Sequence, residues 1–400
     1  MSYQSHILMI YSAITGTGSY LPSLLVENQN FEQHEFLNAD GSPFKHPNQI
    51  IIEKFKAITG IAERRYAEAN LNTSDIAFLA AEKAIADAGI DKEELDYIIF
   101  AHNFGDVAHG QSQGDTLPSL ATRVKHHLRI KNPKCVAYDL LFGCPGWVEG
   151  VVQANAFIKS GIAKRCLVIG AETLSRIVDP NDRDSMIYSD GAGATIIAET
   201  ENDGQILAHA SATYAHDEAY FLFYGKSYNS DAKEDTKYIK MFGRKIYEFA
   251  LSHVPQAMKE CVDESGVAIS EIKKIFIHQA NEKMDEAIVQ RFYELYDMKA
   301  PEGIMPMIIG KFQIMPVRLT DVSELLNRDL DSEFAPNGKV AIGGKVVIQG
   351  FPLVIQAAGM VNLIDAEICG SKIGNASLDW QADQDAVRVT SCSQDFLGGS

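Results

Sequence analysis

The chain has 400 residues, a formal net charge of −17 at pH 7 and a hydrophobic fraction of 46%. This length is enough for one large or several smaller domains with a substantial core. The negative charge argues against a general nucleic-acid-binding protein, because such proteins present basic surfaces to phosphates. No apolar run approaches the ~20 residues of a membrane-spanning helix, and no basic segment precedes an apolar stretch at the N-terminus. We therefore expect neither a membrane span nor a signal peptide.

The six cysteines are scattered along the chain, at positions 135, 144, 166, 261, 369 and 392. None of them forms a CxxC pair, which argues against a zinc site and against a disulfide framework. A free cysteine most often behaves as a small buried apolar residue. We expect reduced thiols, as in a cytoplasmic protein.

Helical and strand-like patterns alternate along the chain. Residues 76–88 carry apolar residues at helical spacing, and an acidic turn separates them from an apolar strand at residues 97–101. A second strand is predicted at residues 135–140, a helix at residues 145–160, and a third strand at residues 166–170. This alternation is typical of an α/β architecture.

Two segments of the chain are similar to each other, residues 89–103 and residues 266–281. Each follows an amphipathic helix, passes through an acidic turn, and ends in an apolar strand with a histidine at its tip. These histidines are His102 and His278, and the second strand is predicted at residues 274–277. The similarity indicates two related α/β halves. The two histidines need not share a role, and His102 could be a hydrogen-bonded polar group at a strand end.

Cys144 lies in the segment YDLLFGCPGWVEGV, in which an apolar strand leads into Gly-Cys-Pro-Gly and then into a helix. Proline is favourable at the first position of a helix, because its missing N–H would be unpaired there. Cys144 is therefore predicted at or near a helix N-terminus, where free N–H groups and the helix dipole favour a thiolate. Because a thiolate is the attacking form, a catalytic nucleophile is one interpretation and a buried structural thiol is the other.

Four further sites are candidates for function or for structure. His278 is predicted at a strand end that opens into a loop, which suits a cleft, although a hydrogen-bonded core histidine is the common alternative. Asn281 precedes a helical pattern at residues 282–292 and is either an N-cap or a site residue. The segment SDGAGA at residues 189–194 permits close backbone approach but is not a GxGxxG motif. Thr-Gly-Thr-Gly at residues 15–18 is interpreted as a turn.

Five segments together resemble the β-ketoacyl-ACP synthase III group of the thiolase superfamily. They are ITGTGSYLP (14–22), TGIAERRY (59–66), AYDLLFGCPGWVEG (137–150), AKRCLVIGAETLSRIVDPNDRDSMIYSDGAGA (163–194) and IHQAN (277–281). They stand in the family's order. The cysteine segment, DGAGA and HQAN form a specific combination, which favours the catalytic interpretation of Cys144 and His278.

The resemblance implies an α/β, thiolase-like fold with two duplicated α/β halves in a layered αβαβα arrangement, and it implies a homodimer. We expect residues 1–200 to form the half that carries the nucleophile and residues 201–366 the half that carries the histidine. Residues 367–400 are rich in Ser, Asp, Gln and Gly. That composition predicts a flexible tail.

The resemblance also implies a ping-pong mechanism without a metal or other cofactor, as in fatty acid or related polyketide-like synthesis. Cys144 takes an acyl group from acyl-CoA or acyl-ACP, so coenzyme A thioesters and acyl carrier protein are the implied partners. Malonyl-ACP then loses CO₂ and condenses with the acyl group to give a β-ketoacyl thioester. His278 would stabilise the enolate. The N–H of Cys144 and a turn at residues 357–360, with Ala358 and Gly359, would form the oxyanion hole.

The sequence departs from the family where a Gly-Asn pair normally supplies a catalytic asparagine. Residues 308–322 read IIGKFQIMPVRLTDV, and Gln313-Ile314 stand at the expected place of that pair. Three explanations remain open. The activity has diverged to acyl transfer without decarboxylation, another residue replaces the missing side chain, with Gln313 the nearest candidate, or two compensating frameshifts have altered the recorded sequence.

A second departure concerns the acyl donor. Family members hold the adenine of CoA with a tryptophan and an arginine just before the TGI motif, but residues 51–61 read IIEKFKAITGI. Arg64 and Arg65 remain as candidate phosphate contacts, and a solvated basic pair is the alternative. Three functions are therefore compared: a decarboxylating condensing enzyme, an acyltransferase of the same fold, and a degenerate partner subunit of a ketosynthase.

Overall fold

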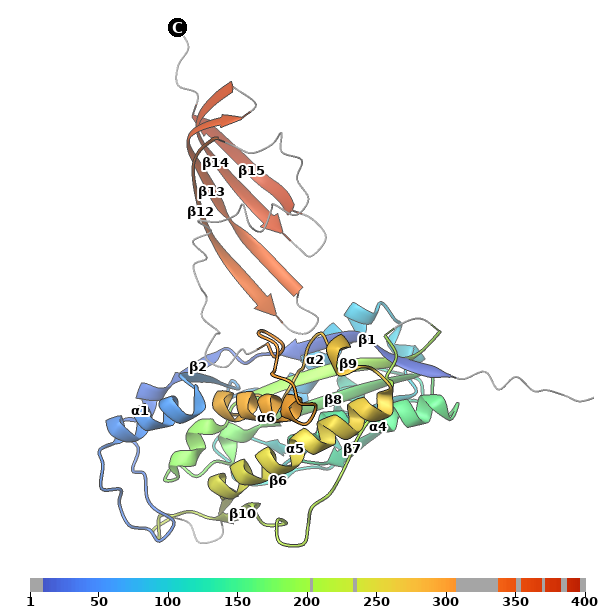
Figure 1. Cartoon of the computed structure of the whole chain (residues 1–400), viewed down its shortest axis with the longest axis vertical. Coiled ribbons are helices and arrows are strands. Elements are labelled where there is room, and N and C mark those ends of the chain that lie inside the picture. Colours follow the sequence, from blue (N-terminus) through green and yellow to red (C-terminus); the bar gives the residue numbers. More distant parts are fainter. Residues whose placement is uncertain are drawn as a thin grey trace, which may run out of the picture. The chain divides into compact units, whose positions relative to one another are not determined.

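The computed structural model describes residues 10–201, 204–232 and 236–306, together with the backbone of four strands between residues 337 and 395. The chain divides into one unit at residues 1–311 and a second at residues 312–400. Figure 1 labels the helices and strands of both units. Within the described ranges, each helix is too short or too polar to cross a lipid bilayer.

A five-stranded mixed sheet forms the centre of the first unit, in the order β1-β9-β8-β4-β7. Its strands are β1 (Tyr11–Tyr20), β4 (Tyr97–His102), β7 (Val136–Leu141), β8 (Arg165–Thr173) and β9 (Asp190–Thr200). Strand β4 runs parallel to both β7 and β8, whereas β9 is antiparallel to β8 and to β1. The carboxyl ends of β4, β7 and β8 therefore meet at one edge of the sheet, the usual place for a ligand site in α/β folds.

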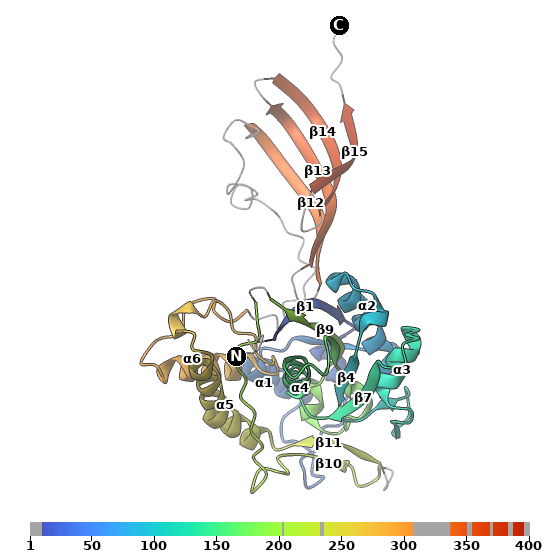
Figure 2. The ribbon, with the colours of Figure 1, turned by 90° about the vertical axis from the view of Figure 1, so that its right-hand side faces the viewer.

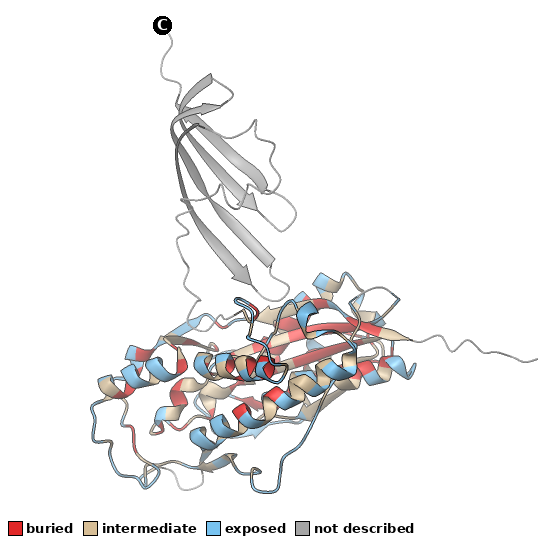
Figure 3. Ribbon diagram, viewed as in Figure 1, coloured by how far each residue is buried: buried red, intermediate tan, exposed pale blue. Residues whose placement is uncertain are grey.

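Helices cover both faces of this sheet, because alternate residues of each strand point to opposite sides. On β4, Ile98 and Phe100 join the core under α2 (Thr73–Ala88) and α3 (Leu120–His127). Ile99, between them, joins the core under α4 (Gly146–Lys159). Figure 2 shows α4 and α2 on either side of the sheet, and Figure 3 shows buried residues along its strands. The predicted α/β alternation over this part of the chain is confirmed.

The segment Thr-Gly-Thr-Gly at residues 15–18 lies within β1, so its interpretation as a turn was wrong. A Cβ atom on Gly16 would lie 2.5 Å from the Ala84 carbonyl oxygen, and one on Gly18 would lie 2.2 Å from the Ala80 carbonyl oxygen. Both distances are far below van der Waals contact. The two glycines are required because α2 packs directly on the backbone of β1.

The remaining elements of the first unit surround this core. They are β2 (Leu24–Glu27), η1 (Asn28–Phe31), α1 (Asn48–Thr59), β3 (Glu63–Tyr66), η2 (Lys92–Glu94), β5 (Asp106–Val107), β6 (Gly114–Asp115), η3 (Leu174–Arg176), η4 (Arg183–Ile187), β10 (Leu222–Lys226), β11 (Lys237–Met241), α5 (Gly243–Ser265), η5 (Ile269–Glu271) and α6 (Glu282–Glu294). Strands β2 with β3, β5 with β6, and β10 with β11 form antiparallel pairs. Helices α5 and α6 pack side by side (Figure 1).

The strand predicted at residues 274–277 is wrong: the segment before His278 has no regular secondary structure. Its Ile275 N–H donates to the Ile304 carbonyl oxygen at 2.9 Å. An apolar run becomes a strand only where neighbouring strands complete its ladder of hydrogen bonds. The similarity of the two segments predicts a histidine at a strand tip in each, and this is confirmed for His102 at the end of β4 but wrong for His278.

The second unit contains an antiparallel meander of four strands. They are β12 (Asn337–Gln349), β13 (Val354–Ile368), β14 (Ser371–Ala382) and β15 (Val387–Asp395). The structure thus differs from the flexible tail expected at residues 367–400. Composition alone missed a period-two pattern of apolar and polar residues at 376–382, which is typical of a strand.

Candidate active site

Cys144 lies between the end of β7 and the start of α4, as the sequence predicts. Pro145 is the N-cap residue of the helix, and Gly146 is its first residue. The Cys144 side chain is exposed. The sulfur therefore lies beside the positive end of the α4 dipole, and the Cys144 backbone N–H also favours its negative charge.

Two glycines on α4 fix the position of the cysteine above the sheet. A Cβ atom on Gly146 would lie 2.8 Å from the Ala101 Cβ atom on β4, and one on Gly150 would lie 2.7 Å from Val168 Cγ1 on β8. Any larger residue at these positions would push the helix away from the strands. Because α4 lies so close to the sheet, Cys144 is held at the carboxyl ends of β4 and β8.

His278 lies far along the chain from Cys144, yet the two side chains lie close enough for each to shift the pKa of the other. His278 is exposed, as Cys144 is. The segment before His278 is held by Ile277, which packs in an apolar cluster with Met284 and Ile288 of α6. The structure therefore brings together the two residues that the sequence analysis named as the catalytic pair.

The electrostatics of this pair favour a thiolate and an imidazolium. Interaction with His278 lowers the pKa of the Cys144 thiol, and partial desolvation by the surrounding atoms opposes that effect although the side chain is exposed. The same interaction raises the pKa of His278 against partial desolvation, and the charges of Cys144 and Asp285 add to the rise. A proton shared in this way titrates as a property of the pair. The pair can thus supply both a nucleophile and an acid.

Asn281 has the capping role that the sequence allowed for it. Its side-chain oxygen accepts a hydrogen bond from the Met284 N–H at 3.1 Å and so caps α6. Asn281 is also buried. Asn281 is three positions after His278 in the sequence. Its role in supporting catalysis stays a prediction.

The other histidine of the internal pair, His102, is a buried polar group at the end of β4. Its Nε2 atom lies 2.9 Å from an Asp139 carboxylate oxygen, and its Nδ1 atom accepts from the Gly105 N–H at 3.2 Å. Asp139 in turn accepts from the N–H groups of Leu120 and Ala121 at the start of α3. His102 therefore connects three elements, which agrees with its structural interpretation.

The sequence suggested Arg64 as a phosphate contact, but the structure does not place it where it could bind a substrate. Its side chain is 4% exposed. Its guanidinium donates to the carbonyl oxygens of Met186 and Val26 and to the Asn28 side chain. Burial lowers its pKa to about 10. Arg64 is therefore a structural residue, while the more exposed Arg65 remains a candidate for phosphate contact.

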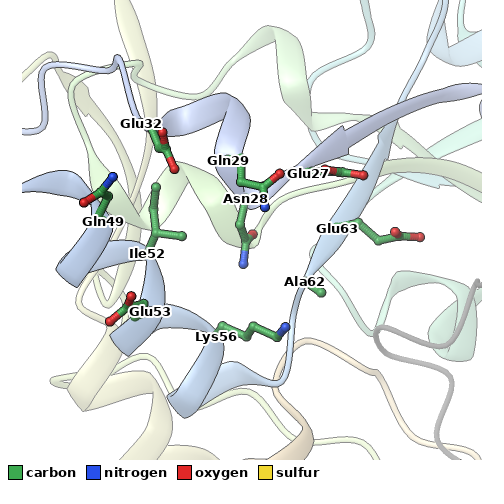
Figure 4. A pocket seen from close by; sticks show the side chains of 10 residues that line it. All are labelled: Glu27, Asn28, Gln29, Glu32, Gln49, Ile52, Glu53, Lys56, Ala62 and Glu63. Atoms are coloured by element: carbon green, nitrogen blue, oxygen red, sulfur yellow. The ribbon is translucent and has the colours of Figure 1, made fainter.

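A pocket of about 550 Å³ lies between α1, η1 and the segment leading into β3 (Figure 4). Its lining residues are Glu27, Asn28, Gln29, Glu32, Gln49, Ile52, Glu53, Lys56, Ala62 and Glu63. Four of them are glutamates and one is a lysine. This lining is unfavourable for the phosphates of a coenzyme A thioester, and it includes neither Cys144 nor His278.

Three other predicted site residues fall in the second unit. Gln313 lies outside the described residues. Ala358 and Gly359 lie inside β13, where their backbones pair with Lys345 and Gly344 of β12. The turn expected at residues 357–360 is therefore a strand. Its apolar, β-branched flanks, from Val354 onwards, favour a strand over a turn.

Two carboxyl groups beside the catalytic pair were missed by the sequence analysis. Glu172, at the end of β8, accepts a hydrogen bond from the Asn103 N–H, and burial raises its pKa to about 7. Asp285 of α6 is buried with Ile288 and Phe292 on one face of the helix. A charged residue on an apolar helical stripe was the signal available for Asp285. Within the described residues, no cluster of three or more His, Cys, Asp or Glu could hold a metal ion.

Comparison with known proteins defines the class of this chain. The family model described as 3-oxoacyl-[acyl-carrier-protein (ACP)] synthase III matches residues 138–215. The chain is 34% identical over 283 residues to β-ketoacyl-[acyl-carrier-protein] synthase III 1 of Vibrio vulnificus, covering 70% of this chain and 81% of that protein. It is 36% identical over 280 residues to β-ketoacyl-[acyl-carrier-protein] synthase III of Neisseria meningitidis, covering 70% and 80%.

Solved structures agree with these relatives. The crystal structure of 3-oxoacyl-[acyl-carrier-protein] synthase III from Aquifex aeolicus matches with a TM-score of 0.58 and 29% identity, covering 74% of this chain and 84% of that one. The enzyme from Thermus thermophilus matches with a TM-score of 0.59 and 28% identity, covering 74% and 84%. The fold is therefore α/β and thiolase-like, and the molecule is an enzyme of the acyltransferase type. The chain belongs to the β-ketoacyl-[acyl-carrier-protein] synthase III family.

Proposed function

We propose that this enzyme transfers an acyl group to Cys144 and then condenses it with malonyl-ACP, releasing CO₂. The observation that carries this proposal is the pairing of His278 with Cys144, which directly precedes the N-cap of α4; the pKa of the thiol is lowered and that of the imidazole raised. The relatives named above are synthases that act with acyl carrier protein, which supports the same carrier here.

The first half-reaction uses the pair as nucleophile and acid. The Cys144 thiolate attacks the carbonyl carbon of an acyl-CoA or acyl-ACP thioester, and the carbonyl electrons move to its oxygen. The N–H groups at the start of α4 are suited to stabilise this oxyanion. When the intermediate collapses, the donor's C–S bond breaks and the departing thiolate takes the proton of the His278 imidazolium. Cys144 then carries the acyl group, and His278 is neutral.

The second half-reaction forms the carbon–carbon bond. Malonyl-ACP loses its carboxylate as CO₂, and the bonding electrons move into the thioester as an enolate. The N–H of neutral His278 donates to the enolate oxygen. The enolate carbon attacks the Cys144 thioester, a C–C bond forms, and the Cys144 thiolate leaves. A proton from solvent restores the imidazolium. Substrates and the two residues balance every step, so we infer that no metal or redox cofactor is needed.

One observation favours a second candidate, acyl transfer without decarboxylation. No asparagine occurs in the sequence between Asn281 and Asn327, so the family's Gly-Asn pair is missing. Because that asparagine would share the enolate charge with His278, its loss weakens the second half-reaction more than the first.

Intact-protein mass after incubation with acyl-CoAs and acyl-ACPs, followed by malonyl-ACP, tests the proposal. We expect the mass to rise by one acyl group, and malonyl-ACP then to discharge that group with an equal amount of CO₂ and a β-ketoacyl-ACP. Acylation without CO₂ would establish the second candidate. No mass increase with any donor would contradict both and favour the degenerate partner subunit.

We also propose that the enzyme is a homodimer and that it works in the cytoplasm. Strand β7 is an edge of the sheet, and its Val136 and Leu141 are 46% and 70% exposed. An exposed apolar edge strand is a place where a second strand can pair, and a second copy would supply one. The described cysteines are free, which supports a reducing compartment.

Replacing Val136 with lysine tests the dimer. A lysine on this edge is expected to weaken association at least about tenfold, because its charge would be buried in the interface. Light scattering should then give a mass near the 44.0 kDa of one chain instead of twice that value. Lys134→Ala, just before the strand, is the control and should remain dimeric. Equal masses for wild type and Val136→Lys would contradict an interface along β7.

A further inference from the structure

Asp285 is a buried carboxyl group in the interior face of α6. It is 1% exposed, and neither of its side-chain oxygens has a hydrogen-bond partner among the residues the structure describes. It lies one helical turn after Asn281, the N-cap that follows His278 in the HQAN segment. Buried carboxylates of this kind are costly and usually have a compensating charge.

The apolar packing on either side of Asp285 includes the residue that directly precedes His278. Ile277, the residue before His278, belongs to the apolar cluster that contains Met284 and Ile288, on either side of Asp285 along the helix. The cluster also includes residues of α5, so both helices hold the segment in place. The positive charge that can compensate Asp285 is therefore the imidazolium of His278.

Asp285 and His278 each favour the charged form of the other. Burial raises the pKa of Asp285 to about 7, and the charge of His278 is the largest effect that opposes this rise. Reciprocally, the charge of Asp285 raises the pKa of His278. Glu282 and Glu286, on α6 itself, raise the pKa of Asp285 further.

Other ionisable groups near Asp285 and His278 are Cys144, its neighbour Glu172, and side chains of the helices that pack on α6. Cys144 raises the pKa of His278, and Glu172 of β8 raises that of Cys144. Helix α5 carries Arg244, Glu248, His253 and Lys259, and α1 carries Lys56 in its last turn. None of these is among the main effects on Asp285. His278 is thus the cation that Asp285 responds to.

We propose that Asp285 is a positioning residue whose buried carboxylate stabilises the positive charge that His278 carries when it is paired with the Cys144 thiolate. This inference rests on the proposed function of that pair. By holding the proton on His278 until the donor thiolate leaves, Asp285 would keep the nucleophile ionised at neutral pH. It would act through His278 and would not touch the substrate.

The ring signal of His278, followed by NMR against pH in protein labelled with ¹³C-histidine, tests this inference. A His278→Gln variant assigns the signal. In Asp285→Asn we expect the pKa of His278 to fall by about one unit, the scale of a nearby opposite charge. The midpoint of thermal unfolding should stay the same or rise, because a buried carboxyl group is replaced by a neutral one. A merely structural role predicts the reverse: a lower midpoint and an unchanged His278 pKa.

Glu286→Gln is the matched control, because it removes the same charge from the next residue of α6, which is exposed. It should leave the pKa of His278 almost unchanged, since solvent screens an exposed charge. In the unaltered protein, with aspartate labelled as well, the carboxyl ¹³C signal of Asp285 should titrate near pH 7, and in His278→Gln its pKa should rise because the opposing positive charge is lost. An unchanged pKa of Asp285 in His278→Gln, or of His278 in Asp285→Asn, would overturn the inference. Both pKa values are measured without turnover. They therefore test the role of Asp285 even if the condensation assay fails.

Discussion

Replacing Cys144 with alanine is expected to abolish covalent acylation and to lower product formation by a factor on the order of 10⁴ to 10⁶, as removal of a catalytic nucleophile does. The reason is that no other described cysteine has its environment. Burial raises the pKa of Cys135 to about 11 and that of Cys166 to about 12. Burial also raises the pKa of Cys261 on α5. Only at Cys144, among the described cysteines, is the pKa lowered.

Intact mass with and without an acyl donor measures this effect, and Cys261→Ala is the matched control. Cys261 is partly exposed, so the control removes an accessible thiol without touching the site. It should acylate as the native protein does. Acylation that persisted in Cys144→Ala, or that vanished in Cys261→Ala, would contradict the assignment of the nucleophile.

The pH dependence of alkylation gives an independent check on the same pair. Because the pKa of Cys144 is lowered by His278, iodoacetamide should modify Cys144 at pH values where an ordinary thiol is protonated. In His278→Ala this interaction is lost, so the pKa of Cys144 should rise and the rate at neutral pH should fall. An alkylation profile that is identical in both proteins would show that the histidine does not activate the sulfur.

The sequence allowed the nucleophile and its helix to be predicted because the signals there are local. A strand, a glycine, the cysteine, a proline and a second glycine fix the start of α4 within a few residues, and the structure confirms it. His278 was named as the partner of Cys144 from the HQAN segment, through the resemblance to the family. The strand expected before His278 was not observed, because strand formation depends on neighbours that are distant in the sequence.

The errors at other residues have related causes. Arg64 lies beside Arg65 in the sequence, and nothing local distinguishes the buried arginine from the exposed one. Three partners far along the chain, one of them the Met186 carbonyl, decide that Arg64 is structural. Residues 15–18 resembled a turn because of their glycines, but the requirement was the close packing of α2, which is a tertiary contact. Both errors arose because the decisive contacts come from residues that are distant in the sequence.

Lys240 is a second buried, positively charged residue besides Arg64. Of the proposed substitutions, removal of its charge is expected to lower the stability of the fold most. Lys240, on β11, is 1% exposed. Its Nζ atom lies 2.6 Å from Asp179 Oδ2, 3.1 Å from Asp182 Oδ2, and 3.3 Å from the centre of the Tyr228 ring. This lysine therefore neutralises two buried carboxylates and joins the β10–β11 hairpin to the segment before η4.

Lys240→Met, which keeps most of the side-chain volume, should lower the free energy of unfolding by about 3–5 kcal/mol, because it leaves the two carboxylates buried without a cation. Chemical denaturation at pH 7 measures this. Lys237→Met, at the exposed end of the same strand, is the control and should change stability by less than about 0.5 kcal/mol. Adding Asp179→Asn to Lys240→Met should restore part of the loss, since the two side chains are in direct contact.

The loss should also depend on pH in a definite direction. The pKa of Asp179 is lowered, against burial, by its hydrogen bond to Lys240 first and by three further hydrogen bonds. A carboxyl group with a lowered pKa in the folded state contributes stability at neutral pH, and that contribution is lost as the pH falls through the folded pKa. Without Lys240 the carboxylates protonate more readily, so the difference between the native protein and Lys240→Met should shrink as the pH falls from 7 towards 4. A difference that is constant over this range would mean that the lysine stabilises the fold through packing of its chain and not through its charge.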